Sequence, residues 1–445
     1  MIDERCKDCS LFLEVQELKK LVAELQKRLD KYEKAEKNSS NSSVPSSTDR
    51  YNKKYPKRQP SQSNSGGQNG HIGFTKKQVD NPDEIIELTP EKCAFCGCNH
   101  LLKHADVFKT RQVFDIPIVF PFVTEYRQTV AVCPSCGKKN KMNFPDDVKA
   151  NTQFGQNTLS TIGYLNVQNH LSYKRIKQLF KYLFHFDISE GTIDLQIKAL
   201  ENKLLPAYDN ILENLKTSKI VGSDETGTRV AKENWYQWVF QNNKFSYFKT
   251  AKSRGFNVIE ELFGRIFYGF WISDRLGSQL KIQALHQLCL AHLIRECRYL
   301  IESEKSSWAS RFKKVIEYGI EFKNSKEEFN PNAVEEYRTI ERIKRVLDKL
   351  FKNIPKEENT KKLYKGLMGR QEQLLMFLMD SDVPATNNGS EQALRNRVVH
   401  RKVCGCFRSG TGAGSHDVIA SIIETAKKQN VDILSALNNP AICFN

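Results

Sequence analysis

The sequence predicts a multidomain α/β protein in which a mixed core follows several smaller N-terminal modules. Its 445 residues exceed what one hydrophobic core usually organises. A heptad pattern opens the chain, and two Cys-x-x-Cys pairs follow before residue 140. Beyond residue 216, short apolar runs alternate with segments of helical periodicity, as expected of an α/β domain.

The charge balance predicts a polyanionic partner. There are 68 basic and 52 acidic residues, a net charge of +16. Nucleic acid is the first expectation and an anionic membrane surface the second, with a basic soluble protein as the alternative. Twelve cysteines without a signal-peptide pattern favour metal binding in a reducing, bacterial-type cytoplasm. No apolar run approaches the roughly 18 residues of a spanning helix, so we expect no membrane insertion.

Residues 1–36 are predicted to form a coiled-coil helix. The apolar seam has alternating spacings of four and three, which favours self-association into at least a dimer over packing on the same chain. It comprises Leu11, Val15, Leu18, Val22, Leu25, Leu29 and Tyr32. Cys6 and Cys9 have no second pair nearby, so zinc there is the disfavoured interpretation. Residues 37–85, rich in Ser, Asn, Pro and Gly, are predicted to be a disordered linker.

Residues 86–147 are predicted to be a small β domain that binds Zn²⁺. Cys93 and Cys96, then Cys133 and Cys136, make two knuckles whose four thiolates suit a closed tetrahedral site. Cys98 and His100 are additional donors, and Cys98 in place of one of the four remains an alternative. Strands are expected over residues 107–118 and 124–132. The metal would staple a domain that binds DNA.

Residues 148–215 are predicted to be helical. A helix over residues 172–184 and a second beginning near Ser189 resemble a helix-turn-helix. Lys174, Arg175 and Lys177 would contact phosphates. The alternative is a helix pair that binds nothing.

Residues 216–445 are predicted to form the core. An apolar run that stops on Asp224 is followed by strands at 235–241 and 245–250, a helix at 256–263, and a fully buried strand at 265–274 that ends on Asp274. A helix is expected at 286–300. This β-β-β-α-β-α order is that of a ribonuclease-H-like fold, in which the first and fourth strands are adjacent and both carboxylates converge. Residues 301–380 would be a helical insertion that contacts DNA or shields the site, or whose apolar stripe only packs.

A third carboxylate is expected from Glu391. The preceding Asn and Ser residues suit a helix cap, which would place Glu391 in the first turn. Three carboxylates can hold two Mg²⁺ (or Mn²⁺) ions roughly 3.5–4 Å apart for phosphoryl transfer. The following basic residues are predicted to neutralise DNA phosphates. They are Arg395, Arg397, His400, Arg401, Lys402 and Arg408.

Several motifs resemble the bacterial insertion-sequence transposases of the sixty-six family. They are Ser223-Asp-Glu-Thr-Gly227 with Trp235, Ser273-Asp-Arg275, the stretch from His286 to Arg295, and Thr386-Asn-Asn-Gly-Ser-Glu391 followed by Arg401-Lys402 and Phe407-Arg-Ser409. The resemblance covers nearly the whole chain, including the coiled coil, linker and Cys-x-x-Cys modules. Gln392, Asn396 and Leu276-Gly-Ser depart from the family pattern without touching an expected ligand.

The resemblance implies a DDE transposase that pairs two element ends, with accessory proteins often needed. Asp224, Asp274 and Glu391 would be the metal ligands. Cys289 and His292 match a Cys-x-x-His motif, with structural support or a contact near the active site as its role. A histidine satisfied within the core is the favoured interpretation of His292, and His286 has the same two interpretations. A DNA-binding protein that no longer transposes and a ribonuclease-H-like nuclease are the alternatives.

Overall fold

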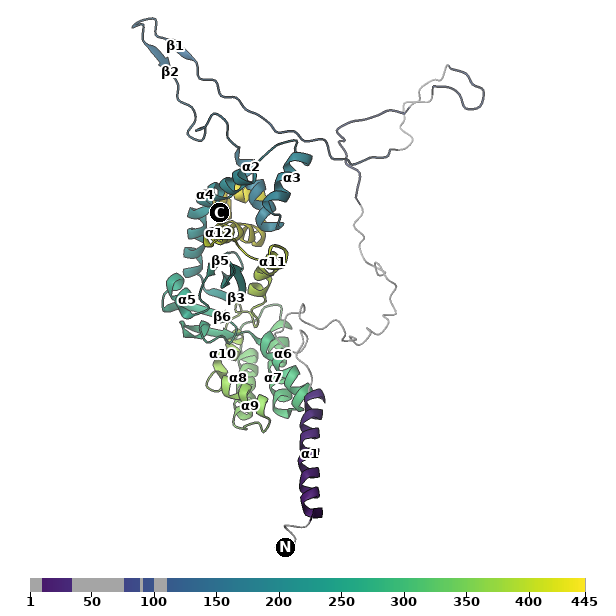
Figure 1. The fold of residues 1–445 in the computed structure, drawn as a ribbon, viewed down its shortest axis with the longest axis vertical. Coiled ribbons are helices and arrows are strands. Elements are labelled where there is room, and N and C mark those ends of the chain that lie inside the picture. The colour runs from purple at the N-terminus through teal and green to yellow at the C-terminus, as the bar shows by residue number, and fades with distance from the viewer. Residues whose placement is uncertain (1–9, 34–75, 89–90, 100–109, 445) are drawn as a thin grey trace. The chain divides into compact units, whose positions relative to one another are not determined.

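The computed structural model describes residues 10–33, 76–88, 91–99 and 110–444 (Figure 1). Contacts divide the chain into two compact units. The larger comprises Met1–Asp49, Val123–Tyr182 and Phe186–Asn445, and the smaller comprises Arg50–Phe122 and Leu183–His185. Each unit is described by itself. Within the described residues, no helix is long and apolar enough to cross a membrane.

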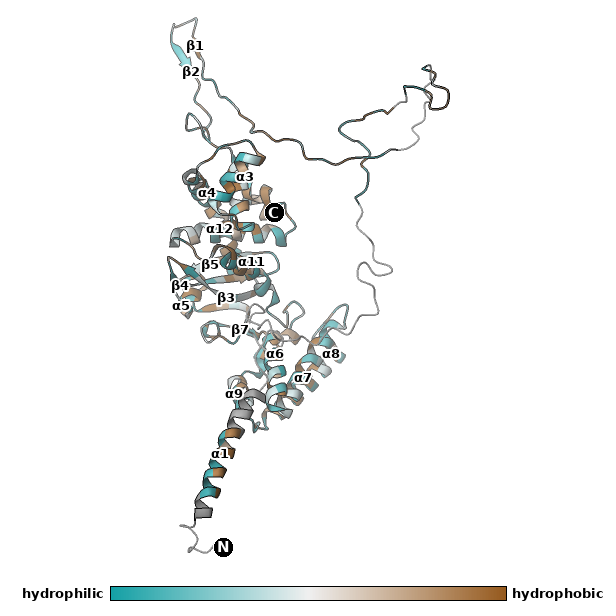
Figure 2. Cartoon of the chain, turned by 45° about the vertical axis from the view of Figure 1, so that its right-hand side comes forward, coloured by the Kyte–Doolittle hydropathy of each residue, from teal (hydrophilic) through white to brown (hydrophobic). Residues whose placement is uncertain are grey.

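Helix α1 (Ser10–Glu33) is a single uninterrupted helix, as the heptad pattern predicts. Its described seam side chains are exposed: Val15 by 42%, Leu18 by 59%, Val22 by 51% and Leu25 by 52%. In Figure 2 brown apolar bands alternate with teal polar ones along this helix. The seam is therefore available to another helix, which leaves the self-association prediction open.

The helical segment that follows is largely as predicted. It contains α2 (Gln156–Gly163), the π-helical turn η3 (Tyr164–Gln168), α3 (Tyr173–Leu183) and α4 (Glu190–Lys216). Ser189 caps α4 by accepting a hydrogen bond from the Thr192 amide at 3.0 Å. Tyr173 on α3 donates to Asp194 on α4 at 3.2 Å, which holds the two helices together.

A five-stranded mixed sheet forms the centre of the larger unit, in the order β5-β4-β3-β6-β7. The strands are β3 (Ile220–Val230), β4 (Glu233–Gln241), β5 (Ser246–Ala251), β6 (Ile266–Ser273) and β7 (Gln283–Leu288). Strand β4 is antiparallel to β3 and β5, whereas β3, β6 and β7 are parallel. The predicted adjacency of the first and fourth strands is confirmed.

Three details of the predicted core are wrong. Strand β3 does not stop on Asp224 but continues to Val230, because β4 pairs with it along that whole length. Residues 283–288 form strand β7, so the following helix α6 is Leu290–Glu304 and His286 lies in the sheet. Strand β6 is not fully buried, since Tyr268 is 92% exposed.

Helix α12 (Gly410–Lys428) closes the β5 edge of the sheet. Its Asp417, Ser421 and Thr425 side chains are four residues apart and accept hydrogen bonds from alternate β5 amides. The amides are those of Thr250 at 2.6 Å, Phe248 at 3.0 Å and Ser246 at 3.1 Å. An edge strand that would otherwise present unpaired N–H groups is thus satisfied by a helix.

The remaining helices complete the larger unit. They are α5 (Phe256–Phe263), η4 (Gln279–Lys281), α7 (Ser307–Asn324), α8 (Val334–Phe351), α9 (Glu358–Leu367), α10 (Gln371–Leu375), η5 (Met376–Leu378), α11 (Asn388–Cys404), α13 (Ile433–Asn438) and η6 (Pro440–Cys443). Helices α7 to α10 form the predicted insertion. Ile340, Ile343, Leu347 and Leu350 of its apolar stripe are buried in the core that these helices share, so the stripe serves packing. Val346 is 45% exposed.

The predicted β zinc domain has little regular structure in the described residues. One hairpin forms, from β1 (Val130–Val132) and β2 (Lys139–Lys141). Residues 110–129 contain no strand, although strands were expected over 107–118 and 124–132. Their apolar side chains are exposed, as for Ile116 and Phe122, so no sheet face buries them. Residues 107–109, Cys6, Cys9, His100 and most of the predicted linker lie outside the described residues.

Candidate functional site

Asp224 and Asp274 lie just beyond the point where the parallel strands β3 and β6 stop pairing. The parallel register pairs Gly222 of β3 with Ile272 of β6, and Asp224 and Asp274 come two residues later on their strands. The register between β6 and β7 pairs Ser273 with Leu288, so Asp274 and Cys289 come next. The Cys289 amide donates to the Ser273 carbonyl at 2.9 Å. Side chains from three parallel strands therefore meet at one edge of this sheet.

Helix α11 brings Glu391 to the same edge. Glu391 lies in its first turn, as predicted. Asn387 occupies the cap position, but its side chain makes no cap hydrogen bond. Instead the Asn387 amide group donates to the Ser223 carbonyl at 2.7 Å, and Ser390 donates to Asn387 Oδ1 at 2.7 Å. The expected helix cap is thus a clamp that joins α11 to β3 directly before Asp224.

Gly222 lies at this close approach. A Cβ atom there would lie 2.6 Å from Gln241 Nε2, 2.9 Å from Ser390 Oγ and 3.0 Å from Asn387 Oδ1. A larger residue would therefore require these side-chain ends to move, and two of them, those of Ser390 and Asn387, belong to the clamp between α11 and β3.

The surroundings of Asp224 oppose its ionisation. Its Oδ1 accepts a hydrogen bond from the Glu225 amide at 2.8 Å. Burial, followed by repulsion from Asp274 and Glu225, raises the pKa of Asp224 to about 8. Glu225 itself is engaged: it accepts from Arg254 at 2.7 Å and from Gln279 at 2.6 Å. A carboxylate whose neighbours oppose its ionisation suits a bound cation.

His292 lies between the other two acids. Its Nδ1 is 3.0 Å from Asp274 Oδ1 and its Nε2 is 3.5 Å from Glu391 Oε1. Burial opposes protonation, but Asp274 and Cys289 outweigh it and raise the pKa of His292 to about 10. Arg295, one helical turn further on α6, donates to Glu391 Oε1 at 3.1 Å. His292 therefore lies among the predicted acids, which favours a contact near the active site over a histidine of the apolar core.

His286 lies in the core, but its buried Nδ1 has no hydrogen-bond partner among the described residues. This side chain is buried in β7, and its Nε2 lies 2.8 Å from the Ile282 carbonyl. Burial lowers the pKa of His286. The sequence alone could not assign different environments to His286 and His292, because it predicted one helix over both. In the structure His286 lies in β7 and His292 in α6.

The basic residues of α11 and of the segment after it divide into three groups by exposure. Arg395, Lys402 and Arg408 are exposed, as phosphate contacts require. Arg401 is half-buried and donates to the Gly227 carbonyl, which ties α11 to β3. Arg397 and His400 are buried, contrary to the expectation of phosphate contact. Arg397 packs over Phe248 with its guanidinium 4.5 Å from the ring centroid, and His400 stacks on Phe407 at 4.7 Å.

One departure from the family pattern has a structural role. Asn396 on α11 lies 2.9 Å from His170 Nε2 and donates to Gln168 at 3.3 Å, which attaches α11 to the segment around η3. Gln392 is exposed. On α3, Lys174, Arg175 and Lys177 are exposed on the face opposite the buried Ile176 and Phe180.

The two Cys-x-x-Cys knuckles have the same local geometry. In the first, the Gly97 amide donates to the Cys93 carbonyl at 2.9 Å and the Cys93 amide to the Cys98 carbonyl at 2.9 Å. The second repeats both bonds with Gly137, Cys133 and Lys138, also at 2.9 Å. Gly97 and Gly137 have φ of +74° and +67°, which glycine adopts without strain.

Each knuckle favours its first thiolate. Backbone hydrogen bonds from Cys96 and Phe95 lower the pKa of Cys93, and those from Cys136 and Ser135 lower the pKa of Cys133. The thiolate is the form that binds metal. The donor chemistry of each knuckle thus fits half of a Zn²⁺ site. The first knuckle belongs to the smaller unit and the second to the larger.

Asp224 and Asp274 thus lie where β3 and β6 stop pairing, with Glu391 brought beside them by α11. Carboxylate oxygens are ligands that divalent cations prefer. Residues 151–415 match the family model described as "Transposase IS66 family". The chain therefore belongs to the IS66 family of transposases. It is also 22% identical, over 400 residues, to "Uncharacterized protein y4jD" of Sinorhizobium fredii; the match covers 81% of this chain and 76% of that protein.

Proposed function

We propose that the protein is a DNA transposase that binds the terminal inverted repeats of its element, cleaves their 3′ ends and joins them to target DNA. The observation that supports this most strongly is the meeting of Asp224, Asp274 and Glu391 at one sheet edge. The sheet order, with one antiparallel strand among parallel neighbours, is the one expected of a ribonuclease-H-like core. Two of the three acids come from adjacent parallel strands, as the predicted chemistry requires.

The donor set fits Mg²⁺. Asp224, Asp274 and Glu391 would hold it, because carboxylate oxygens are its preferred protein ligands. The raised pKa of Asp224 shows that burial and the neighbouring carboxylates outweigh the favourable charge of His292 there, which a bound cation would offset. When bound, the ions would activate a water or a 3′-hydroxyl and stabilise the leaving oxygen. Glu225 is excluded as a ligand by its bonds to Arg254 and Gln279.

The protein's own residues would position the DNA. Arg395, Lys402 and Arg408 extend from the segment that presents Glu391 and would neutralise backbone phosphates. Asn387 and Arg401 hold α11 against β3, so the third acid stays in register with the first two. The chemistry would be a single in-line displacement at phosphorus, without a covalent enzyme intermediate.

The remaining modules would recognise and pair the DNA ends. The exposed basic residues of α3 support phosphate contacts beside the Ser189-capped helix α4. The thiolate-favouring knuckles support a Zn²⁺ site made by Cys93, Cys96, Cys133 and Cys136. The exposed seam of α1 supports self-association, which a reaction on two ends needs.

A DNA-binding protein without transposition activity is the main alternative. It gains nothing from carboxylates that repel one another at a sheet edge. A nuclease with the same core would cleave and not join. Strand transfer therefore separates the three functions.

The test is a strand-transfer reaction in vitro. Labelled DNA ending in the inverted repeats that flank the gene is incubated with target plasmid and Mg²⁺, using wild-type protein, Glu391→Gln and the control Gln392→Glu. Joined product is expected with wild type and the control and not with Glu391→Gln. Cutting without joining would indicate a nuclease, and binding without chemistry, even with neighbouring gene products added, would indicate the binding protein.

A further inference from the structure

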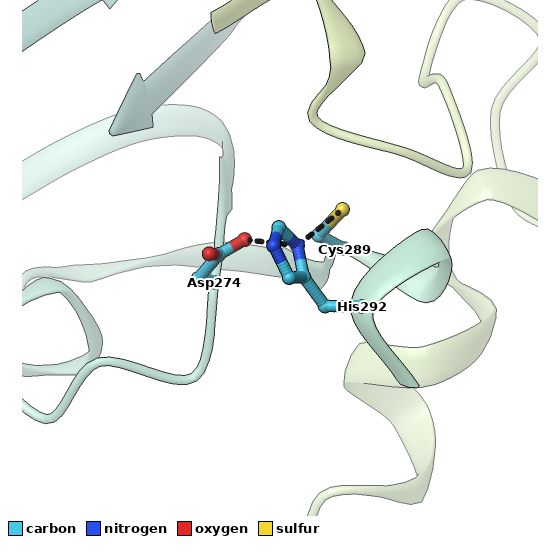
Figure 3. A group of neighbouring side chains, drawn as sticks. All are labelled: Asp274, Cys289 and His292. Atoms are coloured by element: carbon cyan, nitrogen blue, oxygen red, sulfur yellow. Dashed lines mark hydrogen bonds and ion pairs between the residues drawn. The ribbon is translucent and has the colours of Figure 1, made fainter. Parts of the chain in front are cut away.

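Three donors of different chemistry converge beside the carboxylate site. Asp274 Oδ1, Cys289 Sγ and His292 Nδ1 all lie within 4.8 Å of one another. Figure 3 shows the imidazole of His292 between the Asp274 carboxylate and the Cys289 sulfur. Mg²⁺ takes oxygen ligands, so a thiol and an imidazole add nothing to its binding. An oxygen, a nitrogen and a sulfur donor are instead a ligand set of Zn²⁺.

The separations fit a tetrahedral ion. His292 Nδ1 is 3.4 Å from Cys289 Sγ and 3.0 Å from Asp274 Oδ1. Usual Zn–S and Zn–N lengths with tetrahedral angles place sulfur and nitrogen donors about 3.5 Å apart, and nitrogen and oxygen donors about 3.3 Å apart. These two separations therefore match a tetrahedral ion to within a few tenths of an ångström, and the third, between Cys289 and Asp274, lies within 4.8 Å.

The hydrogen bonding around Asp274 Oδ1 and His292 Nδ1 is incomplete. Asp274 Oδ1 is buried, and among the described residues no hydrogen-bond donor is aligned with it despite the nearby imidazole. A single ring nitrogen, Nδ1, faces both Asp274 and Cys289, and one N–H cannot point at two acceptors well. A cation placed among the three atoms would satisfy all of them at once.

Neighbouring groups make hydrogen bonds or polar contacts that orient these donors, as the residues around a metal site commonly do. The Asn387 amide donates to Cys289 Sγ at 3.2 Å, and the other ring nitrogen of His292 lies 3.5 Å from Glu391. Metal-binding histidines commonly direct their second nitrogen to a carboxylate in this way. Cys289 starts α6 and His292 follows in its first turn, so both are held by one helix end.

We propose that Asp274, Cys289 and His292 form a second, Zn²⁺-selective site, with water as the fourth ligand, whose occupation withdraws Asp274 from Mg²⁺ and inhibits the enzyme. Binding releases the thiol proton and any proton on Nδ1 to solvent. Zinc above the level needed for the four-cysteine site would then silence the protein reversibly. Only the inhibition rests on the proposed transposase function; the zinc site does not.

Zinc content without DNA tests the site directly. Full-length wild type, Cys289→Ala, His292→Gln and the control Cys297→Ala are equilibrated with Zn²⁺ buffered by a chelator, and bound metal is measured by mass spectrometry. Cys297 is a buried cysteine of the same helix whose surroundings are apolar. Wild type and Cys297→Ala are expected to bind one more zinc per chain than the other two variants. Equal content in all four would overturn the proposal.

Co²⁺ absorption tests whether Cys289 is a metal ligand, and a Mg²⁺ titration of strand transfer tests whether zinc inhibits by competing for Asp274. Co²⁺ should give wild type one extra thiolate charge-transfer contribution that Cys289→Ala lacks and that His292→Gln weakens, with circular dichroism confirming that both variants are folded. In the wild-type strand-transfer reaction, zinc should raise the Mg²⁺ concentration for half-maximal activity at least tenfold. A zinc effect that Mg²⁺ does not relieve would overturn the inhibitory role. If no variant transposes while zinc content still follows Cys289, the proposed function fails and the site stands.

Discussion

Asn387 Nδ2 donates a 2.7 Å hydrogen bond to the Ser223 carbonyl, the peptide group directly before Asp224. This bond connects two residues that are 164 positions apart. It joins the helix of the third acid to the strand of the first. The backbone N–H of Asn387 also donates to Cys289 Sγ at 3.2 Å, so this one residue links β3, α11 and the start of α6.

Removing this clamp should impair both stability and chemistry. Asn387→Ala leaves the buried Ser223 carbonyl without its donor, which costs about 1–3 kcal/mol of unfolding free energy. Because Glu391 would also shift, we expect strand transfer to fall roughly tenfold to a hundredfold. Asn388→Ala, at the exposed neighbouring position, should stay within about 0.5 kcal/mol of wild type. Equal effects of the two substitutions in denaturant titrations would contradict the clamp.

The seal of α12 on β5 should also be measurable. Ser421→Ala removes the oxygen that accepts from the buried Phe248 amide at 3.0 Å. An unsatisfied buried amide costs about 1–3 kcal/mol, so the free energy of unfolding measured by urea denaturation should fall by this amount. The control is Ser435→Ala on α13, where the side chain is exposed. A neutral Ser421→Ala would show that another acceptor replaces the hydroxyl.

His400 should make the fold sensitive to acid. Burial, then the charges of Arg397 and His170, lower the pKa of His400 to about 3. The unfolded chain binds a proton near pH 6.5, whereas the folded chain does not until about pH 3. The contribution of this group is therefore complete above pH 6.5 and lost as the pH falls towards 3.

His400→Phe tests this pH dependence, because phenylalanine keeps the stack on Phe407 without titrating. When the pH is lowered from 7 to 5, the unfolding free energy of wild type should fall by about 1–2 kcal/mol more than that of the variant. The measurement is chemical denaturation at both pH values. A difference between the proteins that does not change with pH would refute the assignment.

The two Cys-x-x-Cys turns indicate which cysteines would bind the structural zinc. Cys93→Ser, Cys96→Ser, Cys133→Ser and Cys136→Ser should each lower zinc content by about one ion per chain, because a site with three thiolates binds much more weakly. Cys406→Ser, at an exposed position on another segment, is the control. Cys98→Ser should retain the metal. Loss with Cys98→Ser and retention with Cys96→Ser would show that Cys98 is the ligand.

Prediction from sequence succeeded where the local pattern dominates. The helix α5 has the bounds expected from its periodicity, and the Ser189 cap of α4 follows from a serine before a helical run. It failed for β7, because Gln283–Leu288 is short and continues into helical sequence without a turn residue. Only pairing with β6, a non-local interaction, makes this segment a strand.

By itself, the sequence determined which chemical groups are present and in what local setting. Asp224, Asp274 and Glu391 stand in recognisable motifs, and the knuckle glycines and paired cysteines specify their own turns. The tertiary structure decided which of these groups meet. It placed Cys289 and His292 against Asp274, and it buried Arg397 and His400 away from any phosphate. The physical reason is that burial and convergence depend on which strands pair and which helices pack on them, and these contacts join residues far apart in the chain.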